Sequence, residues 1–78
     1  MRLNRCGKRV KLARVEKDMK QAELAAALSV DHGIEINQKG ISNIEVGEKR
    51  VTDIDLIALA DVLGVSAAWL LYGDKKDK

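Results

Sequence analysis

Hydrophobic residues recur at intervals of three and four along most of the 78-residue chain, which is the spacing of one face of an α-helix. The pattern predicts a first helix over residues 3–17, with Leu3, Cys6, Val10 and Ala13 on its apolar face. Basic residues fill much of the rest of this segment, so the expected helix would be apolar on one side and positively charged on another.

Residues suited to helix ends mark a second and a third helix. The second is expected from about Lys20 to residue 31 or 32, and Gly33 after it suits a left-handed C-cap. Asn37 is a good N-cap for a third helix over residues 38–46, which would turn Ile41 and Ile44 inward.

Two more helices follow, and each begins at a hydroxyl residue. Thr52, with Asp55 three residues later, resembles a capping box and opens a fourth helix that ends at residue 63. Ser66 would cap a short fifth helix through residue 71. No strand of useful length is apparent, so the sequence predicts an all-α fold of five helices.

Composition is that of one small globular domain. The chain is 46% hydrophobic and 33% charged, and we expect a domain over residues 1–73 followed by a polar tail, residues 74–78. The net charge is +2, but residues 1–50 carry +4 and residues 51–78 carry −2. This asymmetry is a weak hint of an anionic partner, although an ordinary solvated surface explains it equally well.

Several classes of function find no support in the sequence. No apolar run approaches the roughly 20 residues that span a bilayer, and we expect a cytoplasmic protein. Cys6 and His32 are the only residues of their types, which argues against a disulfide and against a metal site. Without a catalytic set or a phosphate-binding glycine motif, the sequence predicts neither an enzyme nor a cofactor or small-molecule ligand.

Three segments occur in an order that is specific for one family: "KQAELAAAL", "ISNIEVGEKR" and "LIALADVLGVSAAWLL". With them the chain resembles the repressor/Cro-type (XRE-like) helix-turn-helix family of DNA-binding proteins over most of residues 8–72. The resemblance implies a compact fold of the phage repressor type that binds double-stranded DNA, with the third helix in the major groove.

The chain departs from the family between its second and third helices, where the usual connection is about six residues shorter. We expect the second helix to gain about one turn and Gly33 to reverse the chain. Ile34 and Ile36 would then face the core and Glu35 the solvent, on the side away from the groove. Direct contact of this connection with DNA is the alternative, against which the acidic Asp31 and Glu35 argue.

The resemblance assigns the outward side of the third helix to base reading, by Gln38, Lys39, Ser42 and Asn43. Gln can pair with adenine and Lys can donate to guanine in the major groove. Ordinary surface polarity is the alternative for each.

Phosphate contacts are expected at two places. Lys20 and Gln21 stand at the start of the second helix, where backbone N–H groups attract anions, and Lys49 and Arg50 follow the third. Lys8 and Arg9 could add further phosphate contacts, although solvated surface charge is the better explanation for each of them singly.

The resemblance also implies two structural assignments. Arg14 and Glu45 are expected to form a partly buried ion pair that fixes the angle of the third helix. Val65, Trp69 and Tyr72 are expected to form the contact of a homodimer on a palindromic operator, because they lie in the less basic half of the chain.

The sequence therefore predicts a sequence-specific transcriptional regulator, most simply a repressor. Two alternatives remain at this stage. The same fold serves as a protein-interaction module, for example in an antitoxin, and it also occurs as a specificity domain within longer proteins.

Overall fold

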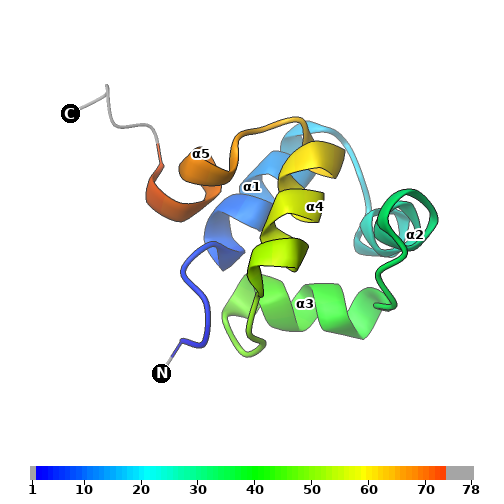
Figure 1. Cartoon of the computed structure of the whole chain (residues 1–78), viewed down its shortest axis with the longest axis horizontal. Coiled ribbons are helices and arrows are strands. Elements are labelled where there is room, and N and C mark those ends of the chain that lie inside the picture. The colour runs from blue at the N-terminus through cyan, green and yellow to red at the C-terminus, as the bar shows by residue number, and fades with distance from the viewer. Residues whose placement is uncertain (1, 74–78) are drawn as a thin grey trace.

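The computed structural model describes residues 2–73, and in this range the chain forms five α-helices and no strand (Figure 1). The all-α, five-helix fold predicted from the sequence is confirmed. The expected polar tail, residues 74–78, lies outside the described residues. The helices are α1 (Gly7–Glu16), α2 (Gln21–His32), α3 (Gln38–Val46), α4 (Asp53–Leu63) and α5 (Ala67–Tyr72).

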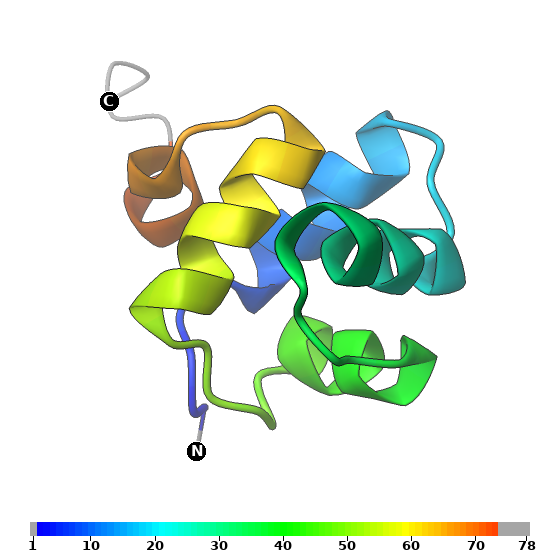
Figure 2. The same ribbon diagram turned by 45° about the vertical axis from the view of Figure 1, so that its right-hand side comes forward.

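The helices α1 and α4 lie next to each other in the middle of the molecule, with α2 and α3 packed on one side and α5 on the other (Figures 1 and 2). Apolar side chains from all five helices meet between them. Burying each large one contributes roughly 1.5–3 kcal/mol. Those with almost no exposed surface include Val10, Leu24, Leu28, Ile41, Ile44, Leu59 and Leu70.

The capping residues expected from the sequence are in place. The Asn37 side chain accepts a hydrogen bond from the Gly40 N–H (2.9 Å), and Ser66 Oγ accepts one from the Trp69 N–H (2.9 Å). Thr52 and Asp55 form a reciprocal capping box at the start of α4. These local bonds explain why the starts of α3, α4 and α5 could be predicted. The fifth helix runs one residue further than expected, to Tyr72.

The start of α1 was predicted wrongly, because the helix begins at Gly7 and residues 3–6 are not helical. Leu3 is exposed rather than buried, and its N–H donates to the Gly47 carbonyl at 2.7 Å. Asn4 Oδ1 accepts from the Gly7 N–H (2.8 Å), while Asn4 Nδ2 donates to the carbonyls of Ile44 (3.1 Å) and Lys49 (2.7 Å). Contacts with the end of α3, about 40 residues away in sequence, therefore replace the predicted first turn.

The long connection between α2 and α3 has the predicted conformation. Gly33 adopts a left-handed conformation (φ 65°), and the next N–H bonds back to Leu28 O at 3.2 Å. Ile34 and Ile36 pack against the core and Glu35 is exposed. Ile36 also covers Gly40 so closely that a Cβ there would collide with its side chain, which explains the glycine inside α3.

None of the helices in residues 2–73 is long and apolar enough to cross a membrane.

Candidate nucleic-acid interface

The solvent side of α3 carries the four residues expected to read bases. Gln38 and Lys39 in its first turn are exposed, and Ser42 and Asn43 one turn later are partly exposed. Helical spacing places Lys39 and Asn43 opposite the buried Ile41 and Ile44, with Gln38 and Ser42 beside them on the flank of α3 that borders Glu45. The structure therefore presents these side chains together, with donors and acceptors available to a partner.

The predicted ion pair between Arg14 and Glu45 is present beneath this face. Arg14 Nε and Nη2 donate to the two carboxylate oxygens of Glu45 at 2.6 and 3.2 Å. The side chains are only 11% and 3% exposed. Arg14 Nη1 also donates to Met19 O (2.7 Å), and Gln21 Nε2 donates to Glu45 Oε1 (3.0 Å). This network joins α1, α2 and α3, so it fixes how α3 sits on the domain.

Gln21 extends the network toward the surface. Its Oε1 lies 3.5 Å from Gln38 Nε2, a long contact, while one N–H of its amide donates to Glu45. The side chain is thus held within the protein, and its second amide N–H is left to donate to a phosphate. The exposed Lys20 is next to it, and the Lys20 N–H donates to Glu23 Oε1 (2.8 Å), a carboxylate at the start of α2 that would repel an anion.

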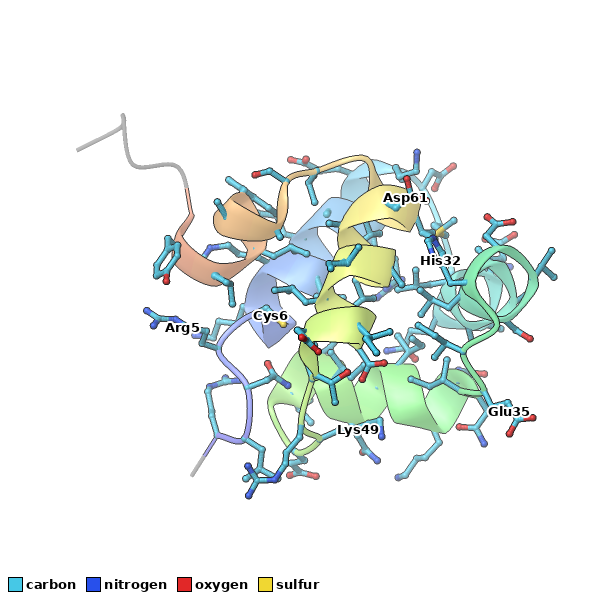
Figure 3. The ribbon with its side chains drawn as sticks, viewed as in Figure 1. Arg5, Cys6, His32, Glu35, Lys49 and Asp61 are labelled. Carbon is cyan, nitrogen blue, oxygen red and sulfur yellow. The ribbon has the colours of Figure 1, made fainter. Side chains whose placement is uncertain are left out.

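The loop after α3 places its two cations differently. Lys49 and Arg50 are both exposed, but Lys49 also lines a cavity of about 70 Å³ between the long connection and α4. The carboxylate residues Glu35 and Asp55 line the same cavity, and Arg50 is not among its lining residues (Glu35 and Lys49 are labelled in Figure 3). Of the two, Arg50 is the better placed to meet a phosphate.

The residues expected at a dimer contact lie on and before α5. Val65 and Trp69 are partly buried against the core, and Tyr72 is exposed. The Arg5 guanidinium lies over the Tyr72 ring, 5.1 Å from its centroid (Arg5 is labelled in Figure 3). Arg9 lies against Gly73.

Two cations from the start of the chain thus reach this end of the molecule. The half of the chain that holds α5 is the less basic one, as counted from the sequence, but Arg5 and Arg9 bring positive charge beside α5, because charge counted along the chain does not give the charge of a face.

One polar contact was missed from the sequence. His32 Nε2 lies 2.9 Å from Asp61 Oδ2 and links the end of α2 to α4 (Figure 3). Nothing in the sequence indicates this contact, because it depends on α2 and α4 packing next to each other. Cys6 is buried as expected, and burial raises the pKa of its thiol. No three potential metal ligands cluster within residues 2–73.

Comparison with known proteins agrees with this geometry. The helix-turn-helix family model matches residues 10–70. The fold is similar to the crystal structure of the P22 c2 repressor protein in complex with a synthetic operator, with a TM-score of 0.74 and 29% identity. That match covers 88% of this chain and 96% of the other. No match to a curated protein sequence was found. The chain belongs to the XRE-type helix-turn-helix family of DNA-binding proteins.

Proposed function

We propose that this protein is a transcriptional repressor that binds double-stranded DNA sequence-specifically by inserting α3 into the major groove. One observation carries the proposal: the exposed polar side of α3 is supported by a buried network of Arg14, Glu45 and Gln21 from three helices. A rigidly held polar helix is what base recognition requires, because each base contact depends on alignment. The similarity to a repressor bound to its operator agrees with it.

In this proposal the first turn of α3 does most of the base reading. Gln38 would pair with adenine N6 and N7, and Lys39 would donate to guanine O6 and N7. The contact between Gln38 and Gln21 supports this role, since it restrains a side chain that would otherwise be free to rotate. Ser42 and Asn43 would contact base edges or phosphates one turn later.

Phosphate contacts would come from Arg50 and from the start of α2. The exposed guanidinium of Arg50 can bind a phosphate in a two-pronged geometry. At α2, Lys20, the backbone N–H groups of the first turn and the second amide N–H of Gln21 are the expected donors. Lys49 would contribute mainly long-range attraction.

We further propose that two copies bind a palindromic site. One recognition helix reads few base pairs, and each mismatch costs only about 1–3 kcal/mol, so a second copy greatly improves discrimination. The surface of Val65, Trp69 and Tyr72 is the proposed contact, and the exposed Tyr72 supports it. Two chains per selected duplex, measured by sedimentation of the complex, are expected.

The function is tested by selecting bound duplexes from a random pool. The account predicts a short palindromic consensus. Equal recovery of all sequences would contradict sequence-specific binding. If no duplex is recovered, the protein does not bind DNA. A stable complex with a protein partner would then favour an interaction module such as an antitoxin.

A further inference from the structure

We propose that Arg2, Lys8 and Lys11 form a further phosphate-binding site, which contacts the DNA backbone along the flank of α3. This inference rests on the proposed DNA-binding function and adds a site to it. The three cations line an open hollow in the surface, called here the basic hollow. Its other lining residues are Gln21, Ser42, Glu45 and Val46.

The fold brings these cations together from separate segments. Lys8 and Lys11 are exposed and lie one turn apart on α1. Arg2 reaches the hollow because the neighbouring Leu3 N–H bonds to Gly47 O (2.7 Å) at the end of α3. A Cβ on Gly47 would lie 2.5 Å from Arg2 Nη1, so the absence of a side chain there makes room for the arginine.

The basic hollow has more positive charge than the protein neutralises. Its one carboxylate, Glu45, is already paired with Arg14. The ion pairs within residues 2–73 are Arg14–Glu45 and His32–Asp61, so none of the three hollow cations is paired there. Like charges held near one another repel, and an anion bound among them would relieve that repulsion.

The position of the hollow identifies the anion as backbone phosphate of the DNA. Ser42 lines the hollow and also belongs to the outward side of α3 that is proposed to face the groove. A helix in the major groove has a phosphate strand on each side, so the hollow would meet one strand. The Ser42 hydroxyl would add a hydrogen bond to the phosphate that the cations attract.

The test compares two single variants of α1 that each remove one exposed positive charge. Lys11→Gln takes one cation from the hollow, whereas Lys17→Gln removes a cation at the other end of α1, which lines no part of the hollow. The measurement is the slope of log affinity against log salt on random duplex. Each lost phosphate contact makes it shallower by about 0.9, so the hollow variant should change by about 0.9 and the control should not change.

Equal slope changes in both variants, or none in the hollow variant, would overturn the site. Suppose that wild-type protein binds duplex and that Arg50→Ala weakens this binding, while the hollow variant binds with the salt slope of wild type. In that case the hollow is not a phosphate site, but the proposed DNA-binding function stands. If wild-type protein binds no duplex, the proposed function fails.

Ethylation interference gives a readout that does not depend on the control. Ethylation of the phosphates that the protein contacts should block binding of wild-type protein to the selected duplex. In Lys8→Gln/Lys11→Gln the phosphates that meet the hollow should lose this effect while the others keep it, and an unchanged pattern would overturn the site.

Discussion

The ion pair of Arg14 with Glu45 and the contact of His32 with Asp61 differ in burial and in what they connect. Arg14–Glu45 joins α1 to α3, makes two hydrogen bonds and is almost inaccessible to water. His32–Asp61 joins α2 to α4 through one contact, with side chains 26% and 69% exposed. The buried pair lies directly behind the proposed recognition helix, while the exposed pair lies at the far end of α2. Because it is buried, the contact of Arg14 with Glu45 should contribute much more to stability and to the position of α3 than the exposed contact of His32 with Asp61.

The largest effect is expected from breaking the buried pair. Arg14→Ala should lower the free energy of unfolding by about 3–5 kcal/mol, because it leaves Glu45 buried and uncompensated. Thermal and chemical denaturation measure this loss. Arg50→Ala, which removes an exposed guanidinium, is the control and should change stability by less than about 0.5 kcal/mol. An unchanged melting temperature in Arg14→Ala would refute the structural role of the pair.

A smaller effect is expected at the edge of the same network. Gln21→Ala removes the hydrogen bond to Glu45 and the contact with Gln38, so it should cost about 1 kcal/mol of stability. It should also reduce discrimination between preferred and random duplexes, since Gln38 loses its restraint. Discrimination equal to that of wild type would show that Gln21 does not position Gln38.

The smallest effect is expected at the exposed pair. His32→Gln and Asp61→Asn should each lower stability by at most about 1 kcal/mol, because solvent screens the interaction. The double variant completes a cycle, from which the coupling energy is obtained. DNA affinity should not change in any of these variants. A coupling energy as large as that of Arg14 with Glu45 would contradict the comparison.

The sequence predicted what local chemistry determines. The caps at Asn37, Thr52 and Ser66 bond to N–H groups three residues away, and the turn at Gly33 depends on one residue's conformation. These interactions involve only near neighbours, so the segment itself contains the information. The ion pair of Arg14 with Glu45 is long-range, and only the family resemblance gave it.

The sequence did not predict contacts that depend on how helices pack. Asn4 bonds to Ile44 and Lys49 and ends the helical pattern of residues 3–6, although their spacing fits a helix. The placement of Arg5 at α5, the contact of His32 with Asp61, and the basic hollow also arise from packing. Each of them brings together residues that no local pattern connects.

The most direct test of the account is whether the first turn of α3 reads bases. Affinities of Gln38→Ala, Lys39→Ala and Arg50→Ala should be measured on the selected duplex and on random duplex at one salt concentration. The account predicts that each α3 variant loses about 1–3 kcal/mol on the selected duplex and much less on random duplex, while Arg50→Ala weakens both alike. Equal losses on the two duplexes for Gln38→Ala and Lys39→Ala would contradict base reading by α3.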